Sequence, residues 1–124
     1  MILNKQLKAI MKLKLLKSKI HRATVTEACL DYEGSISIDQ SLMKKSGILN
    51  HEKVHVLNVT NGSRLETYAI PAKQRGTICI NGAAAHLVSP GDLVIIVSYA
   101  SMNLQEATKH KPQIILLDKN NNVK

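Results

Sequence analysis

The chain has 124 residues, of which 44% are hydrophobic and 2% aromatic, and its formal net charge is +8. This length suits a single domain with its own core and leaves little of these residues for a second module. The chain has no Trp or Phe, so aliphatic side chains must form the core, and a protein that stacks nucleic-acid bases on aromatic residues is disfavoured.

The positive charge is concentrated at the N-terminus. Six of the seventeen basic residues lie in the first twenty positions, which contain no Asp or Glu, and the other eleven are nearly balanced by nine acidic residues. Lysines interrupt every apolar run of this tail, which is typical of neither a signal peptide nor a transmembrane helix. We assign residues 1–14 to a basic extension, disordered or an amphipathic helix, and 15–124 to one domain. An upstream start codon, with the useful chain beginning near Met11, is the alternative.

Short strands separated by turn residues follow this tail. Residues 20–26 alternate and are rich in β-branched side chains, which predicts a strand, and 35–38 predict a second one. Asp39 is a suitable N-cap for a helix that runs to about Lys45 and ends at Gly47.

A β-hairpin is expected in the middle of the chain. Segments 53–60 and 64–70 flank Asn61-Gly62, a dipeptide that tolerates the positive φ angles of a tight turn. Later segments predict strands at 77–80, 93–99 and 113–117 and a helical turn or two at 102–108. Six or seven short strands with brief helices predict a mainly β fold, a small closed barrel.

The two cysteines, Cys29 and Cys79, are fifty residues apart and lie among apolar residues. We expect both to be buried, reduced thiols. Together with the absence of a signal sequence, this predicts a cytoplasmic protein. From the histidines we predict no metal site.

The segment 32–39, YEGSISID, carries the most informative chemistry. A serine hydroxyl can attack the preceding carbonyl and move the acyl group from nitrogen to oxygen, and Gly34 lacks the Cβ that would obstruct the approach to it. The ester formed can eliminate to a dehydroalanine, which hydrolyses to a pyruvoyl group and ammonia. A Gly-Ser dipeptide alone is an ordinary turn and identifies nothing.

Several separated motifs resemble the aspartate 1-decarboxylase family. They are KSKIHRATVT (17–26), DYEGSISID (31–39), VTNGSRLETYAI (59–70) and INGAAAHLVSPGDLVII (80–96), extended by ASMN (100–103) and HKP (110–112). The likeness covers roughly residues 15–118 in the family's order and spacing. The additional N-terminal residues are the one departure.

The resemblance implies a six-stranded double-psi β-barrel with short helices, assembled as a homotetramer with active sites between subunits. It implies self-cleavage into a β chain, 1–34, and an α chain, 35–124, that begins with a pyruvoyl group made from Ser35. The implied activity is decarboxylation of L-aspartate to β-alanine and CO₂, for pantothenate biosynthesis. The pyruvoyl group would accept the electrons, as pyridoxal phosphate does elsewhere, and no metal would be needed.

The resemblance also implies roles for single residues. Lys19 and Arg64 would hold the substrate carboxylates, with His21 beside them, and an arginine fork suits a carboxylate. Thr67 would assist the acyl shift, and Tyr68, a weak acid, would donate a proton. Strand alternation puts Lys19 and His21 on one face, and likewise Arg64 and Tyr68. The pocket would be lined by Tyr32, Asn81, Gly82, Ala83, Ala84 and Ala85.

Each of these residues has an ordinary interpretation as well. Lys19 could end a solvated tail, and His21 could be a strand histidine with a satisfied hydrogen bond. Arg64 and Tyr68 could only stabilise the hairpin, and Asn81-Gly82 could be a plain turn. The alternative function is a non-catalytic β-barrel module whose tail binds nucleic acid or membrane. A decarboxylase is expected to bind neither of these partners. A third hypothesis is a family member that matures only with an accessory protein.

Overall fold

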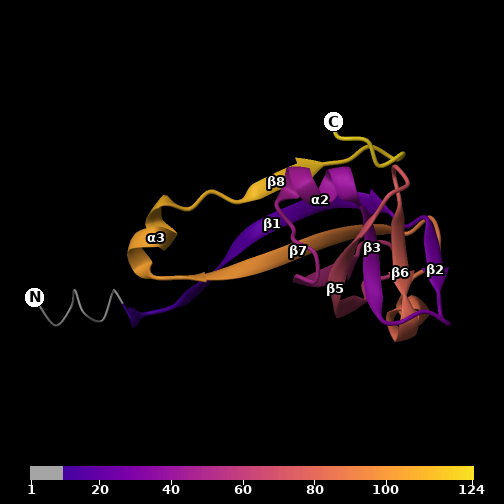
Figure 1. The fold of residues 1–124 in the computed structure, drawn as a ribbon, viewed down its shortest axis with the longest axis horizontal. Helices are drawn as coiled ribbons and strands as arrows, with labels where there is room; N and C mark the ends of the chain where they lie inside the picture. The colour runs from indigo at the N-terminus through magenta and orange to yellow at the C-terminus, as the bar shows by residue number, and fades with distance from the viewer. Residues whose placement is uncertain (1–9) are drawn as a thin grey trace, which may run out of the picture.

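The computed structural model describes residues 10–124 (Figure 1). The first nine residues of the predicted basic extension lie outside this range. The strands are β1 (Leu13–Thr24), β2 (Glu27–Cys29), β3 (Ser35–Asp39), β4 (Lys53–Asn58), β5 (Arg64–Ala72), β6 (Ile78–Asn81), β7 (Leu93–Met102) and β8 (Gln113–Leu116). The helices are α2 (Gln40–Ser46), the 3₁₀ helix η1 (Gly82–Leu87) and α3 (Leu104–Lys109).

The strands form one sheet in the order β2-β6-β3-β5-β4-β7-β1-β8. This sheet closes on itself because β2 continues the chain directly after β1. Between the two strands, the backbone N–H of Thr26 donates to the carbonyl of Ile78 in β6 at 2.8 Å. With β1 and β2 counted as one strand, six strands surround the core and β8 is added outside β1. The predicted mainly β fold with short helices is confirmed, and the strand connections are consistent with the predicted closed, six-stranded barrel.

Strand β5 belongs to both halves of the barrel. Its first part pairs antiparallel with β4, from Leu57 opposite Arg64 to Lys53 opposite Tyr68. Its second part, 69–72, pairs in parallel with β3. The hairpin predicted at Asn61-Gly62 is confirmed, with Gly62 at a φ of 80°. One strand therefore connects the hairpin to the strand that begins with Ser35.

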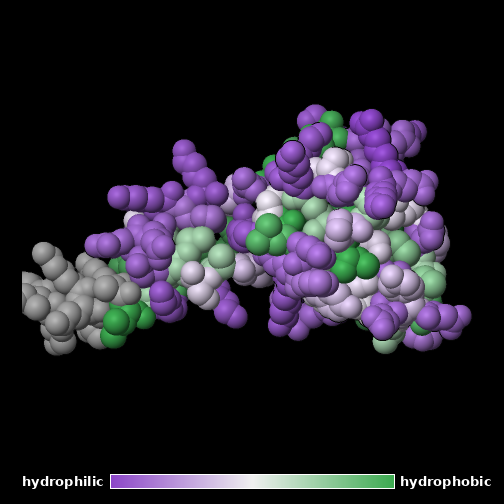
Figure 2. Space-filling model, viewed as in Figure 1, coloured by the Kyte–Doolittle hydropathy of each residue, from purple (hydrophilic) through white to green (hydrophobic). Residues whose placement is uncertain are grey.

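Strands β1 and β7 extend beyond the barrel as a two-stranded arm that ends at α3 (Figure 1). The arm begins with Leu13 opposite Met102. Leu13 and Lys14, which the sequence assigned to the extension, are therefore paired, and β1 begins seven residues before the predicted strand at Ile20. Hydrophilic side chains project from the arm and cover much of the visible face of the body (Figure 2).

The core is aliphatic, as the composition required. Its largest fully buried side chains come from alternate positions of the barrel strands and include Ile20, Ile36, Ile38, Val54, Val56, Ile78, Ile80, Val94 and Ile96. Burying such a side chain contributes roughly 1.5–3 kcal/mol. Because alternate residues point to opposite faces, the intervening residues of β3 and β6 point away from this core.

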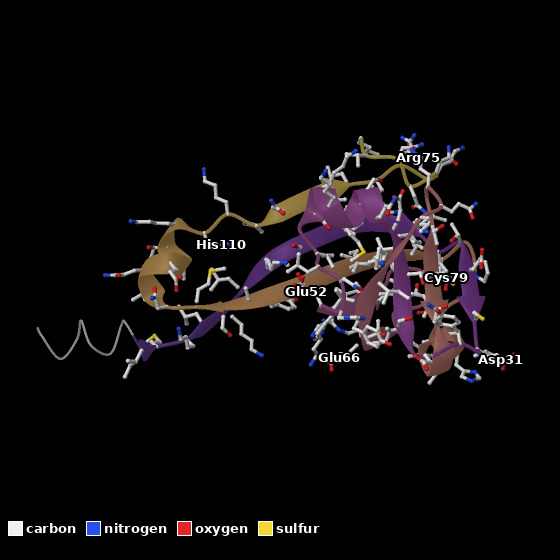
Figure 3. The ribbon with its side chains drawn as sticks, viewed as in Figure 1. Asp31, Glu52, Glu66, Arg75, Cys79 and His110 are labelled. Atoms are coloured by element: carbon white, nitrogen blue, oxygen red, sulfur yellow. The ribbon has the colours of Figure 1, made fainter. Side chains whose placement is uncertain are left out.

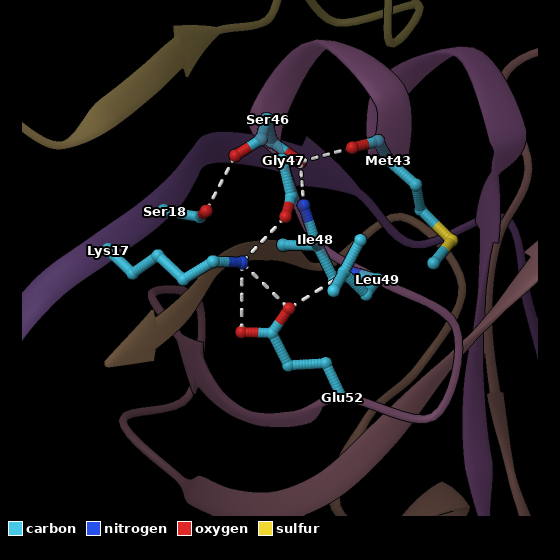
Figure 4. Close-up of polar contacts among 8 residues, drawn as sticks. All are labelled: Lys17, Ser18, Met43, Ser46, Gly47, Ile48, Leu49 and Glu52. Atoms are coloured by element: carbon cyan, nitrogen blue, oxygen red, sulfur yellow. Dashed lines mark hydrogen bonds and ion pairs between the residues drawn. The ribbon is translucent and has the colours of Figure 1, made fainter. Parts of the chain in front are cut away.

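Helix α2 is capped as predicted. The Asp39 carboxylate accepts a hydrogen bond from the Ser41 backbone N–H, and Gly47 ends the helix at a φ of 78°. Lys17, at an irregularity of β1, holds the segment after the helix (Figure 4). Its Nζ donates to the Gly47 carbonyl at 2.6 Å and to Glu52 Oε1 at 2.8 Å.

The two cysteines are both free, but they differ in exposure. Cys79 is buried, as predicted, whereas Cys29 is exposed. The prediction for Cys29 was wrong because β2 is a short strand at the end of the sheet order, where β6 is its one neighbouring strand among the described residues. Among residues 10–124, no helix is both long and apolar enough to cross a bilayer.

Candidate active site

The bond between Gly34 and Ser35 lies where an exposed loop enters the barrel. Gly34 is exposed, whereas Ser35, the first residue of β3, is 1% exposed. Ser35 pairs with Asn81 of β6, and Asn81 Nδ2 donates to Ser35 Oγ at 2.9 Å. The Ser35 hydroxyl itself donates to the Glu33 carbonyl at 3.4 Å. The side chain of Asn81 therefore fixes the hydroxyl beside its own peptide bond.

Gly82 lets the backbone pack closely around this bond. Its φ is 75°, a conformation that favours glycine. A Cβ at this position would lie 2.7 Å from Gly34 Cα, 2.8 Å from Gly34 N and 3.0 Å from the Tyr32 carbonyl oxygen. Gly82 therefore serves as a contact surface for the loop before Ser35 and is more than a turn residue.

Beyond Gly82, the small-residue run forms the 3₁₀ helix η1. Ala85 is buried, Ala84 half-buried and Ala83 exposed. The carbonyl of Leu87, at the end of this helix, accepts hydrogen bonds from Asn61 Nδ2 at 3.0 Å and Ser63 Oγ at 3.1 Å. The hairpin turn thus anchors the helix that follows Asn81.

Thr67 and Tyr68 of β5 lie near Ser35 by strand register. Ile36 of β3 pairs with Ala69 of β5, so the preceding residues, Ser35 and Tyr68, lie at the same level of adjacent strands. Thr67 is half-buried, and Tyr68 is 36% exposed. The rings of Tyr68 and His51 lie 6.0 Å apart between centroids.

Lys19 and His21 lie on β1, which β7 and β4 separate from β5. Three strand spacings amount to about 14 Å. Lys19 pairs with Val97 of β7 and Ile114 of β8. His21 Nδ1 is buried without a hydrogen-bond partner among the described residues. Burial, then the charges of Lys19, Arg22 and Lys124, lower the pKa of His21, which favours a neutral imidazole.

Arg64 lines a pocket between the hairpin and the base of the arm. Its lining residues are Lys14, Lys53, His55, Arg64, Glu66, Tyr99, Ala100 and Ser101. Ser35, Lys19 and Tyr68 do not line it. A single chain therefore brings together Ser35, Asn81, Gly82 and the Thr67–Tyr68 pair, but it does not bring Lys19 and Arg64 into one pocket.

Two residues bonded to Asn81 were not identified from the sequence. Cys79 Sγ donates to Asn81 Oδ1 at 3.2 Å, and Asn81 Nδ2 also donates to Ser37 Oγ at 3.0 Å. Cys79 lies on β6 (Figure 3). A signal was available, because each lies two positions from a predicted site residue in the same strand, and such residues share a face.

The histidines form no metal-binding cluster in the described part of the chain. His51 and His55 have the spacing of an H-E-x-x-H motif, which binds zinc when both histidines lie on one face of a helix. Here His51 lies in a turn and His55 in β4, so the local structure does not match the motif.

The structure is that of a small β-barrel protein in which a buried serine directly follows an exposed glycine and accepts a hydrogen bond from a carboxamide. The sequence model of the aspartate decarboxylase family matches residues 11–124. The chain belongs to this family.

Curated relatives agree with this assignment. The chain is 57% identical over 113 residues to the aspartate 1-decarboxylase of Clostridium beijerinckii, and this alignment covers 90% of this chain and 91% of that protein. It is 59% identical over 111 residues to the aspartate 1-decarboxylase of Campylobacter jejuni, and this alignment covers 90% of this chain and 88% of that protein. A rationally designed protein, mkDPBB_sym_86, aligns with a TM-score of 0.47 and 17% identity over 61% of this chain and 90% of that one, a likeness too weak to carry an argument.

Proposed function

We propose that this protein is a pyruvoyl-dependent enzyme that decarboxylates L-aspartate to β-alanine and CO₂, after cutting its own chain between Gly34 and Ser35. The observation that carries the proposal is the Ser35 hydroxyl, which is buried and hydrogen-bonded to Asn81 beside the exposed Gly34. Relatives 57–59% identical over most of the chain are named aspartate 1-decarboxylases. β-Alanine would serve pantothenate biosynthesis in the cytoplasm.

The cleavage begins with the Ser35 hydroxyl. Its Oγ attacks the Gly34 carbonyl carbon, the bond from that carbon to the Ser35 nitrogen breaks, and the hydroxyl proton passes to the nitrogen. Loss of the Ser35 α-proton then breaks the Cβ–Oγ bond and leaves the Gly34 carboxylate at the end of the 1–34 chain. Water hydrolyses the dehydroalanine at the start of the 35–124 chain to the ketone and releases ammonia.

Asn81 orients the hydroxyl for the first step and suits the second, because negative charge develops on the departing carboxylate, which contains Oγ, as the Cβ–Oγ bond breaks. A hydrogen-bond donor fixed at that atom stabilises the charge as it forms, and Asn81 Nδ2 is such a donor at 2.9 Å. Thr67, one strand away on β5, is placed to assist the acyl shift. Glycines at 34 and 82 leave room for the backbone to rearrange.

The site also fits the ketone that would result, because Ser35 lies against Asn81 and Gly82 at the start of the small-residue helix. When present, a pyruvoyl group supplies an electron sink for decarboxylation without metal or pyridoxal phosphate. Arg64 and Lys19 bind the two carboxylates of aspartate, with His21 beside Lys19. Tyr68 donates the proton that replaces CO₂, and Tyr32 and Ala83–Ala85 border the pocket.

The two cationic residues proposed to bind the substrate lie in different regions of the chain, since Lys19 on β1 is three strands from β5, which carries Arg64. We propose, as the family resemblance implies, that the working enzyme is a homotetramer, and the separation of these residues is compatible with neighbouring copies completing each site. An accessory protein that speeds cleavage is a compatible partner.

The test is Ser35→Ala, compared with wild type and with Ser89→Ala, an exposed serine in a loop. Wild type and Ser89→Ala should give two fragments on a denaturing gel, with an Edman-blocked larger one, and should release CO₂ from aspartate. Ser35→Ala should remain one folded, inactive chain. An uncut, inactive wild type would instead support the non-catalytic barrel module or a family member that matures only with an accessory protein. CO₂ release by Ser35→Ala would exclude the proposed cofactor.

A further inference from the structure

Ser35, Ser37, Cys79 and Asn81 form two directly opposed pairs between β3 and β6. Ser35 lies opposite Asn81, and Ser37 lies opposite Cys79. The residues between them, such as Ile36 and Ile80, fill the core, so the four polar side chains share the other face. Cys79 is nevertheless 7% exposed and Asn81 3% exposed. The pairs form a small, mostly buried polar cluster outside the core.

The hydrogen bonds of the cluster assign a donor and an acceptor to each contact. The Cys79 thiol donates to Asn81 Oδ1 at 3.2 Å, which leaves both Nδ2 hydrogens to donate to Ser35 Oγ and Ser37 Oγ, at 2.9 and 3.0 Å. With the carboxamide reversed, Oδ1 would accept the Ser35 proton and face no thiol donor. Nδ2 would face sulfur, a weak acceptor. The thiol proton thus favours the orientation that presents a donor to Ser35.

Resting on the function proposed above, we propose that Cys79 is a positioning residue for the self-cleavage. Its S–H group holds the Asn81 carboxamide so that Nδ2 stabilises the charge on Ser35 Oγ, and Ser37 accepts the second Nδ2 hydrogen. Within the described chain the Cys79 side chain is hydrogen-bonded to Asn81 and not to Ser35, so it acts through Asn81.

The protonation state of Cys79 agrees with this role. Burial, followed by the negative charge of Glu27 and the neighbouring Cys29, raises the pKa of the Cys79 thiol. The thiol therefore keeps its proton at neutral pH and remains a donor. A thiolate would repel Asn81 Oδ1 and lose the hydrogen bond.

The experiment compares Cys79→Ala with Cys79→Ser, because alanine and serine differ only by the hydroxyl donor. The readout is the rate at which full-length precursor disappears, followed by denaturing gel and intact mass. One positioning hydrogen bond corresponds to roughly a 2- to 10-fold change in rate. We expect Cys79→Ala to be slower by this factor and Cys79→Ser to approach wild type.

Cys29→Ala is the matched control, since Cys29 is exposed, lies opposite Asn81 on β2 and makes no side-chain hydrogen bond to it. It should cleave at the wild-type rate. Cys79→Val, which refills the volume without a donor, should be as slow as Cys79→Ala. If Val restores cleavage while Ser does not, Cys79 acts by packing and the inference is overturned. Wild-type cleavage by Cys79→Ala would overturn it too, with the proposed function intact, whereas an uncut wild type would remove both.

Discussion

At the scale of single residues, Gly82 provides the sharpest mutational test of the cleavage site. Gly82→Ala would place a Cβ 2.7 Å from Gly34 Cα, at a φ of 75°. Both the left-handed backbone and the collision disfavour the substitution, at a combined cost of roughly 2 kcal/mol or more. The Gly34 loop should move away, so we expect the precursor to remain largely uncut after the wild type is fully processed, as measured by intact mass.

Gly62→Ala is the control for Gly82→Ala, because it introduces the same backbone strain without a collision. Gly62 has a φ of 80°, but among residues 10–124 no atom outside Gly62 and its two chain neighbours lies within 4 Å of the position of an added Cβ. The variant should lose stability in thermal unfolding, by about 1 kcal/mol, and still be cleaved completely. Equal cleavage of the Gly82 and Gly62 variants would show that close packing against Gly34 is unnecessary.

The sequence alone singled out Ser35 and Asn81 as candidate site residues, from motifs that resemble the family, but it did not identify the other members of their hydrogen-bonded cluster. Cys79 was interpreted as an ordinary buried thiol, although it lies two positions from Asn81 in the same strand. The bonds that join this pair to Ser35 and Ser37 depend on the β3–β6 register, which no local pattern specifies. The roles assigned to Lys19, Arg64 and Tyr68 stay predictions.

At the scale of elements, Glu52 connects β1 to the segment between α2 and β4 (Figure 4). Burial would raise its pKa, but hydrogen bonds from Lys17 and the Leu49 backbone N–H outweigh burial, and the pKa lies below the ordinary 4.5. A lowered folded-state pKa stabilises the fold fully above pH 4.5, and this contribution is lost as the pH falls through the folded value. We expect the free energy of unfolding to fall on acidification below pH 4.5, in urea titrations of uncut Ser35→Ala at fixed concentration.

In the same background, Glu52→Gln should lower the free energy of unfolding at pH 7 by about 1–3 kcal/mol and flatten its decline in acid. Glu66→Gln is the control, because Glu66 is 58% exposed and lies 3.4 Å from Lys53. It should change stability by no more than about 0.5 kcal/mol. An unchanged acid profile in Glu52→Gln would mean that other carboxylates, such as the α2 cap Asp39, govern the transition.

Local patterns predicted these elements better than they predicted their ends. The caps of α2 and the turn at Asn61-Gly62 depend on residues next to each other in sequence, and both are confirmed. The early start of β1 was missed because its first residues pair with the far end of β7, about ninety positions later. The barrel closure from Thr26 to Ile78 is likewise a long-range contact that alternation cannot specify.

At the scale of the whole molecule, a single barrel provides only part of the expected site. Ser35, Asn81 and Tyr68 lie on adjacent strands, whereas Lys19 lies on the other side of β4 and β7, beside the arm. Symmetric assembly is the usual way in which identical chains complete one another's sites. If β1 of one copy faces β5 of another, each site contains Lys19 and Tyr68 from different chains.

Hybrid tetramers test this geometry. Lys19→Ala and Tyr68→Phe homotetramers should each be almost inactive. When the two variants carry different tags, are co-expressed and are purified as hybrids, they should recover about a quarter of wild-type activity, because random pairing leaves that share of sites with both residues intact. Hybrids of Arg64→Ala with Tyr68→Phe, both on β5, should stay inactive, since every β5 then carries a defect. Native mass measurement should give four chains per particle. If the Lys19–Tyr68 hybrids form but remain inactive, the two residues act within one copy, and the site does not lie between subunits.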